Sequence, residues 1–279
     1  MKKFIIRADI EGVSGIVSAE QTEPGKPDFA YGLKMFHSDL KAVLDGLFTG
    51  GASSVTIYDM HYFGRNVDIS VLPRNTAVVC GKPPYNHADA GGLDSTCSGL
   101  VLLGFHSKHG TDQGLLAHTY EPDITDVRLN GLSVGEIGID AAVAGDFGVP
   151  LVLFTGDSAG AAEAKALVPE TVTAVVKESL GRSAGLCYSL EKTRLDLQEK
   201  ARYAAENCDS AACFRVAGRP VVLEVDLAPK QFLAEFTNLY PGHVQGRGTV
   251  RIEGASVVEV WSEYLVRKVK CYDALGGVR

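Results

Sequence analysis

The chain has 279 residues, enough to bury a large core as one unit or as two lobes. Its 27 basic and 34 acidic residues give a net charge of −7 without a basic tail or stripe, which argues against nucleic acid or a membrane surface as the main partner. No apolar run reaches the roughly 18 residues that a membrane-spanning helix needs, and the N-terminus leads directly into an acidic strand, unlike a signal peptide. The six cysteines are scattered without a CxxC spacing, so we expect reduced thiols and a cytoplasmic protein.

The first predicted strand begins at Lys3 and ends in two acidic residues, Asp9 and Glu11, which are followed by Gly12 and Gly15. Because residues i and i+2 of a strand point the same way, the two carboxylates share one face. Burying two like charges side by side is costly unless a positive group lies between them, and a metal ion is the simplest such group. The alternative is a strand-end turn in which Asp9 caps a backbone N–H and Glu11 is solvated.

Strands and helices alternate through the first half of the chain. Apolar spacing predicts a helix over 31–48, which a glycine pair ends. Short β-rich runs predict buried strands at 54–58, 76–80, 99–103 and 151–155. Asn130-Gly131 predicts a hairpin that joins 126–129 to 132–134 and leads into a helix over about 137–147. This alternation favours an α/β fold with a mostly parallel central sheet flanked by helices.

The second half of the chain has a different pattern. Helical spacing occurs at 159–167, 190–207 and 256–269, and strand-like segments occur at 171–176, 220–225 and 248–252. These segments predict an α+β arrangement. We therefore expect residues 1–157 to form an α/β half with a metal site, and residues 158–279 to form an α+β half that serves substrate binding or assembly, without a flexible linker between them.

Side chains of the types that bind metals recur where the predicted elements begin or end. They are Asp9, Glu11, Asp59, His61, His106 and Glu136. In open α/β sheets, ligands collect beyond the carboxyl ends of the strands, so these side chains are expected to converge. Two imidazoles and three carboxylates suit two metal ions, with zinc the best match and manganese or cobalt also acceptable. One carboxylate must bridge the two ions, and we expect it to be Asp9.

Each of these residues also has a simpler interpretation. A lone histidine such as His61 or His106 is more often a core or loop residue, and Glu136 adds favourable charge to a helix N-terminus. Asp59 is expected either to orient a ligand imidazole or to form a turn. Four similar placements in one chain favour the metal site over these separate explanations. The chain has no HExxH or Walker A motif, which argues against a zincin and a P-loop enzyme.

The motifs around these residues resemble those of a known family. They are DIEGVSG at 9–15, YDMH at 58–61, LLGFHSKHG at 102–110, LAHT at 116–119 and NGLSVGEIGI at 130–139. Together they are similar to the M55 peptidase family, the D-aminopeptidases of the dipeptide-transport type. The resemblance extends over nearly the whole chain, so residues 1–279 are expected to form one unit of this family.

The resemblance implies a zinc-dependent aminopeptidase that acts on short peptides with an N-terminal D-residue of the D-Ala type. It implies two zinc ions per subunit, with Asp9 bridging them. It places Glu11 and His61 on one ion, and the remaining two ligands, His106 and Glu136, on the other. It also implies that His118 is the catalytic residue and that subunits assemble into a ring-shaped homo-decamer enclosing the active sites.

On this hypothesis, a hydroxide shared by the two metal ions attacks the peptide carbonyl. The role of His118 stays open between proton donor to the leaving amine, oxyanion stabiliser and nucleophile. Two other functions remain as alternatives: a metal-dependent amidohydrolase acting on another small amide, and a non-catalytic protein that binds peptides and keeps the metals structurally. The position of His118 on a glycine-bounded segment favours an enzyme.

Overall fold

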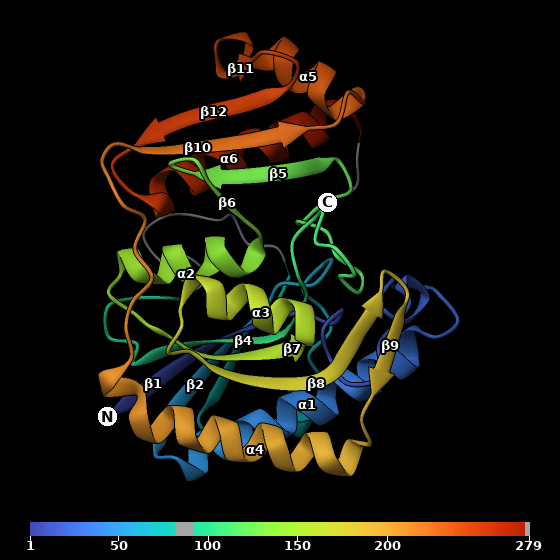
Figure 1. Cartoon of the computed structure of the whole chain (residues 1–279), viewed down its shortest axis with the longest axis vertical. Coiled ribbons are helices and arrows are strands. Elements are labelled where there is room, and N and C mark those ends of the chain that lie inside the picture. Colours follow the sequence, from blue (N-terminus) through green and yellow to red (C-terminus); the bar gives the residue numbers. More distant parts are fainter. Residues whose placement is uncertain (82–91, 277–279) are drawn as a thin grey trace.

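The structure is a computed structural model that describes residues 1–81 and 92–276, and it contains two β-sheets in separate layers (Figure 1). The larger sheet contains β1 (Lys2–Ala8), β2 (Ala52–Asp59), β3 (Thr76–Val79), β4 (Gly99–Phe105), β7 (Leu151–Asp157), β8 (Val172–Gly181) and β9 (Ala184–Cys187). Its strand order is β3-β2-β1-β4-β7-β8-β9, and all neighbours are parallel except β8 and β9. Strands β4 and β7 are buried along their whole length, which explains their largely apolar sequences.

Helices cover both faces of the larger sheet (Figure 1). Helices α1 (Phe29–Thr49) and α4 (Leu190–Asn207) cover one face, and α2 (Glu136–Asp146) and α3 (Ser158–Leu167) lie on the other. In β1, Phe4 and Ile6 belong to the hydrophobic core under α1 and α4, whereas Ile5 belongs to the core on the α2 side. Because side chains alternate along a strand, Arg7 and Asp9 follow Ile5 onto the face toward α2. This alternation directs the first carboxylate between the two layers.

The smaller sheet is antiparallel and forms the upper layer in Figure 1. It contains β5 (Ile124–Leu129), β6 (Leu132–Val134), β10 (Val221–Leu227), β11 (Val244–Gln245) and β12 (Thr249–Gly254), in the order β11-β12-β10-β5-β6. Helices α5 (Gln231–Leu239) and α6 (Val257–Ala274) pack against each other, and α6 also contacts β10, β12 and α2. Every second residue of β10 is buried, so one face of this sheet contributes to the core.

Four single-turn 3₁₀ helices complete the described secondary structure, at Ala19–Gln21, Ile69–Val71, Cys208–Ser210 and Pro241–His243. All six cysteines are free, as the sequence predicts. Across the residues that the structure describes, no helix combines the length and apolar character needed to cross a membrane.

The expected α/β fold with a mostly parallel sheet is confirmed. The Asn130-Gly131 hairpin is also confirmed, with φ values of 49° and 82° at its two central residues. The expected division at residue 157 does not follow the two sheets. Hairpin β5–β6 joins the smaller sheet, where Leu129 lies opposite Leu223, whereas β8 and β9 extend the larger sheet. The periodicity of β5 does not reveal that it pairs with β10, which is far away in the sequence. The expected boundary at residue 157 therefore differs from the boundary between the two sheets.

Three elements, β9, α5 and the two-residue strand β11, have no counterpart among the predicted helices and strands. Strand β9 is only four residues long and mostly exposed, so it lacks the apolar run that marks a buried strand. Helix α5 is nine residues long and buries only Phe232 and Phe236, too few positions for a clear helical period.

Candidate metal centre

The turn that follows β1 lies directly against the end of β4. The backbone N–H of Gly12 donates to the carbonyl oxygen of Gly104 at 2.7 Å. A Cβ atom at Gly12 would lie 1.9 Å from the carbonyl oxygen of Phe105, so only glycine permits this approach. The contact makes Asp9, at the start of the turn, a neighbour of His106, which directly follows β4.

Asp9, Glu11 and His61 form the first ligand set. The Nδ1 atom of His61 lies 2.9 Å from Oδ1 of Asp9 and 3.1 Å from Oε2 of Glu11. The other ring nitrogen, Nε2, lies 2.8 Å from the backbone carbonyl oxygen of Thr22, to which it donates. This hydrogen bond fixes the orientation of the ring and directs Nδ1 toward the two carboxylates.

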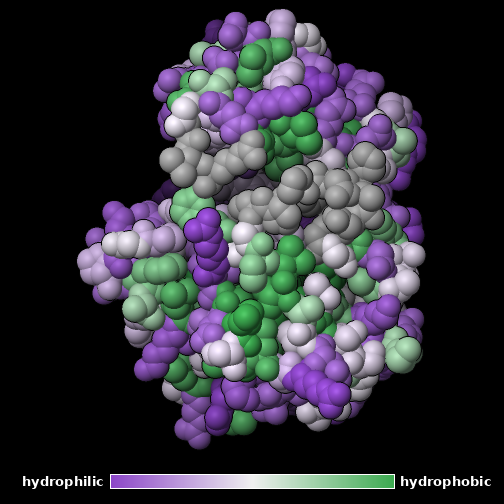
Figure 2. Space-filling view, turned by 180° about the vertical axis from the view of Figure 1, so that it is seen from behind, coloured by the Kyte–Doolittle hydropathy of each residue, from purple (hydrophilic) through white to green (hydrophobic). Residues whose placement is uncertain are grey.

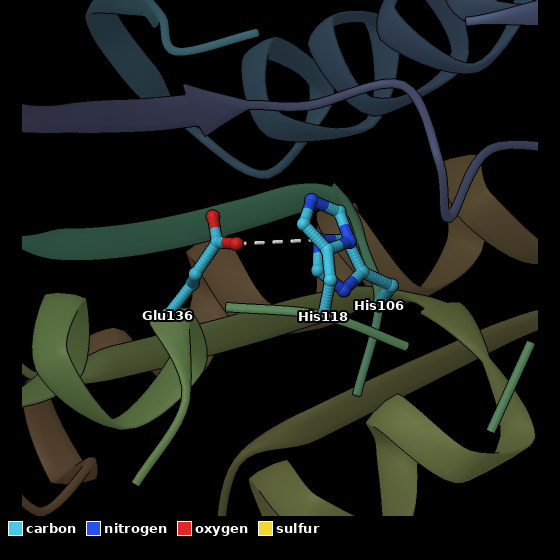
Figure 3. Close-up of side chains that lie close together, drawn as sticks. All are labelled: His106, His118 and Glu136. Atoms are coloured by element: carbon cyan, nitrogen blue, oxygen red, sulfur yellow. Dashed lines mark ion pairs between the residues drawn. The ribbon is translucent and has the colours of Figure 1, made fainter. Parts of the chain in front are cut away.

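His106, His118 and Glu136 form the second ligand set (Figure 3). The Nε2 atom of His106 lies 3.4 Å from Oε1 of Glu136 and 3.5 Å from Oδ2 of Asp9. Its Nδ1 donates to the carbonyl oxygen of Ser107 at 3.0 Å. Asp9 therefore presents one carboxylate oxygen to each ligand set, the position that a bridging ligand needs.

His118 lies beside His106 with the two rings stacked at 4.0 Å between centroids and 9° between planes. Its Nδ1 donates to the carbonyl oxygen of Leu116 at 2.9 Å, which leaves Nε2 available. The carboxylate of Glu136, at the first residue of α2, accepts a hydrogen bond from the backbone N–H of Tyr120 at 2.7 Å. This bond ties the His118 segment to the start of α2.

The donor atoms fit two metal ions. Within each ligand set, one ligand atom per residue lies within 4.8 Å of the others. The closest nitrogen–oxygen separations, from 2.9 to 3.5 Å, are near the roughly 3.3 Å between two ligands of one tetrahedral zinc. Nε2 of His106 is buried and has no hydrogen-bond partner among the described residues, as expected of an atom that faces a cation.

The buried carboxylates of the first ligand set would also be stabilised by a cation. Burial and the neighbouring charge of Glu11 raise the pKa of Asp9 to about 7. Burial opposes ionisation of Glu11 as well, but the charge of His61 holds the pKa of that carboxyl well below its usual value. For His61, burial favours the neutral ring, and the charge of Glu11 overcomes it and raises the pKa well above normal. A metal ion at this position would offset the charge of the two buried carboxylates.

The pKa values of the two histidines in the second ligand set shift in opposite directions. Burial disfavours the charged form of His106, but the carboxylate of Glu136, 3.4 Å from Nε2, raises the pKa of the ring to about 10. Burial and the charge of His106 lower the pKa of His118. Glu136 keeps a lowered pKa in spite of its burial, because the imidazole of His106 lies beside its carboxylate. His118 is therefore the neutral imidazole of the pair.

Asp59 is buried but does not contact the imidazole of His61. Its carboxylate accepts hydrogen bonds from the backbone N–H of Asn66 at 2.6 Å and from the side-chain amide of Asn66 at 2.8 Å. The same amide donates to the carbonyl oxygen of His61 at 2.8 Å. Asp59 therefore holds the loop that carries His61 and acts on the ligand through the backbone.

A buried ion pair joins Arg7 of β1 to Asp140 of α2, and the sequence analysis did not identify it. Arg7 precedes Asp9 by two residues, and Asp140 follows Glu136 by one helical turn, so the pair connects the elements that carry two of the ligands. The available signal was the charged Arg7 after the apolar run of residues 4–6, and the structure leaves this side chain only 1% exposed.

Glu163 of α3 is a second support that the sequence did not reveal. Its Oε2 accepts a hydrogen bond from the backbone N–H of Lys108 at 2.8 Å, and its Oε1 accepts one from the N–H of Gly135 at 3.3 Å. Lys108 lies two residues after His106, and Gly135 directly precedes Glu136. One carboxylate therefore fixes the backbone next to two members of the second ligand set.

The segment that carries His118 is also anchored on α6. The ring of Tyr120 packs against Trp261, with 5.0 Å between centroids. Glu121 forms an ion pair with Lys268 and accepts a hydrogen bond from the hydroxyl of Tyr272 at 2.6 Å. The C-terminal helix thus supports the second ligand set.

Comparisons with known proteins show what this chain is similar to. Residues 1–265 match the Peptidase_M55 family model, described as D-aminopeptidase. The chain is 30% identical over 267 residues to the D-aminopeptidase of Bacillus subtilis (strain 168), which covers 95% of this chain and 96% of that protein. It is also similar to the solved structure of the Zn-dependent D-aminopeptidase DppA from Bacillus subtilis, described as a self-compartmentalizing protease. That match has a TM-score of 0.88 and 29% identity and covers 96% of this chain and 97% of the other.

Proposed function

This chain belongs to the M55 family of D-aminopeptidases, and we propose that it removes an N-terminal D-amino acid from short peptides with two zinc ions at the described centre. The comparisons confirm the family that was expected from the sequence, and with it a peptidase activity. The proposal concerns the finer statements: the D-Ala type of substrate, the zinc count and the roles of the residues.

One observation carries the proposal: the carboxylate of Asp9 lies against His61 of the first ligand set and against His106 of the second, and each of the three histidines has one ring nitrogen committed to a backbone carbonyl. The remaining nitrogens are left for a metal ion or a proton. We assign Asp9 as the bridging ligand, with Glu11 and His61 on one ion and His106 and Glu136 on the other. Nitrogen and oxygen donors favour zinc, and the similar solved structure is described as Zn-dependent.

Zinc ions bound there would polarise the peptide carbonyl and make a water molecule acidic enough to act as the nucleophile near neutral pH. His118 supplies the proton transfer. Because its Nδ1–H is committed to the carbonyl of Leu116, its Nε2 is the atom that accepts a proton and passes it to the leaving amine. The hydrogen bond from Tyr120 to Glu136 holds the His118 segment beside the second ligand set during this transfer.

The test is hydrolysis of D-Ala-containing dipeptides by chelated and zinc-restored protein, with the L-isomers as controls. The proposal expects release of the N-terminal D-residue only after zinc is restored. Equal cleavage of both isomers would remove the stereochemical preference. Cleavage of neither isomer by protein that carries two zinc ions would overturn the proposed activity and favour another amide substrate or a peptide-binding role.

We also propose a homo-oligomer, a ring-shaped decamer that encloses the active sites. Support comes from the relative described as self-compartmentalizing and from apolar side chains on the surface of this chain. Figure 2 shows such side chains gathered on the lobe of the larger sheet. Leu180 and Leu186, on the β8–β9 hairpin, are 61% and 55% exposed. Sedimentation analysis should give about ten times the 29.7 kDa of one chain, and a monomer mass would contradict the assembly.

A cytoplasmic location completes the proposal. Its support is the set of six free cysteines, which suits a reducing compartment. Cell fractionation with a periplasmic or secreted marker as the control would test it.

A further inference from the structure

A single buried ammonium group holds the turn that carries Asp9 and Glu11. Lys177 of β8 has no exposed surface. Its Nζ donates to the carbonyl oxygens of Glu11 at 2.6 Å, Val13 at 2.9 Å and Ile16 at 2.6 Å. An ammonium group has three protons to donate, and here one turn of the backbone accepts all three. The backbone of the ligand Glu11 is one of these acceptors.

Helix α1 also holds this turn, through Asp39. The carboxylate of Asp39 accepts hydrogen bonds from the backbone N–H and from the hydroxyl of Ser14, both at 2.8 Å. Lys177 therefore binds carbonyl groups of the turn and Asp39 binds an amide of it, so that the turn between them has few alternative conformations. Asp157 lies opposite Lys177 on the neighbouring strand and adds a compensating negative charge.

The position of Lys177 excludes direct contact with a substrate, because its side chain is enclosed by the turn and the sheet. Its hydrogen bonds reach the first ligand set only through the backbone of Glu11. Within the described part of the chain, none of them reaches the second ligand set, whose backbone is held by Glu163. The two ligand sets thus have separate supports.

We propose that Lys177 is a positioning residue for one of the two zinc ions, because its ammonium fixes the turn that presents Glu11 to Asp9 and His61. The inference rests on the proposed metal centre and adds to it a residue that lies outside the ligand sets. Residues that orient metal ligands typically change metal affinity by about 10–100-fold when they are replaced. Loss of Lys177 should therefore weaken one zinc by this factor and leave the other in place.

The experiment compares zinc binding by chelator-stripped wild type, Lys177→Met and Lys177→Arg, measured by calorimetric titration, with circular dichroism as a check of the fold. The matched control is Lys165→Met, which makes the same change at an exposed lysine that donates to the carbonyl oxygen of Pro169. Wild type and Lys165→Met should each bind two zinc ions. Lys177→Met should bind one as tightly as wild type and the second about 10–100-fold more weakly.

Lys177→Arg keeps the positive charge but spreads its donors over a plane, so it should weaken the same zinc by a smaller factor. Wild-type affinity for both ions in either folded variant, or equal weakening of both ions, would overturn the inference. Loss of fold in both variants would also overturn it, since Lys177 would then be a residue of general stability. A wild-type protein that binds no zinc would instead refute the metal centre itself.

Discussion

The two ligand sets of the metal centre depend on different parts of the molecule. The first set comes from the turn after β1 and the loop after β2, and its members contact one another at 2.9 and 3.1 Å. The second set comes from β4, the 116–120 segment and α2, and His106 lies 3.4 Å from Glu136. The first set is therefore a local product of the larger sheet, whereas the second requires the two layers to pack correctly.

This difference teaches that the two halves have separate supports at Lys177 and Glu163, although Asp9 and the Arg7–Asp140 ion pair connect them. Asp9 belongs to the first set by its place in the chain and reaches the second through Oδ2, 3.5 Å from His106. Changes at Asp9 should affect both halves, and changes at the supports should affect one half each.

The largest expected effect is that of Asp9→Ala. Because this change removes the carboxylate that faces both ligand sets, we expect zinc content to fall from two ions per chain to nearly none and peptidase activity to fall to background. Elemental analysis of the purified protein measures the first and the dipeptide assay the second. Asp112→Ala, at an exposed aspartate, is the control. Retention of both zinc ions by Asp9→Ala would refute the bridging role.

The second largest effect is expected from the replacement of His118. His118→Ala should retain both zinc ions and lose about 10²–10⁴-fold in kcat, because the proton transfer through Nε2 is removed. The control is His109→Ala, which changes a half-buried histidine of the same glycine-rich segment. If the variant loses one zinc, His118 is a metal ligand, as its place in the second ligand set permits. An unchanged kcat would exclude it from the chemistry.

The contribution of Asp39 of α1 to the stability of the protein can be measured through its pH dependence. Burial raises the pKa of Asp39 from 3.8 to about 6, in spite of its hydrogen bonds with Ser14. Because the folded pKa is the higher one, the contribution of Asp39 to the free energy of unfolding is complete below pH 3.8 and declines as the pH rises to about 6. The decline is about 3 kcal/mol for a shift of this size.

Urea unfolding of wild type and Asp39→Asn at a series of pH values measures this contribution as the difference between the two curves. Asp45→Asn, at a partly exposed residue of the same helix, should follow wild type. A wild-type curve parallel to that of Asp39→Asn between pH 4 and 6 would show that Asp39 is not the titrating group.

The smallest effect is expected from Glu163, the support of the second ligand set. Glu163→Gln keeps the shape of the side chain but replaces one acceptor oxygen with a donor, so one of the two backbone N–H groups loses its partner. We expect one zinc to bind about tenfold more weakly, the lower end for residues that orient ligands. Glu170→Gln, at an exposed glutamate just after α3, is the control in the same titration. Equal effects on both zinc ions would contradict the separation of the two halves.

The sequence was informative where structure is local. The spacing of Asp9 and Glu11 places them together at a strand end, and Asn130-Gly131 specifies a hairpin wherever the chain goes next. The strand-end rule also anticipated that His61 and His106 would converge, because parallel strands end at one edge of a sheet.

The sequence did not reveal what depends on distant packing. Lys177 and Glu163 each stand alone among unremarkable neighbours in a strand and a helix, and their hydrogen-bond partners lie 161–166 and 28–55 residues away. The stacking of His118 on His106 likewise depends on where the 116–120 segment settles against α6. Hydrophobic periodicity indicates which face of a helix or strand is buried. It does not indicate which residues of other elements contact that face.

The contact between Tyr120 and Trp261 gives the molecule an optical reporter of its own. Trp261 is the single tryptophan of the chain, 2% exposed, and its neighbour Tyr120 donates the hydrogen bond that holds Glu136. Its emission therefore responds to rearrangement around the second ligand set, while the first set has no tryptophan beside it to respond. Fluorescence during stepwise addition of zinc should follow binding at the second ligand set and so reveal whether the two proposed zinc ions bind in a fixed order.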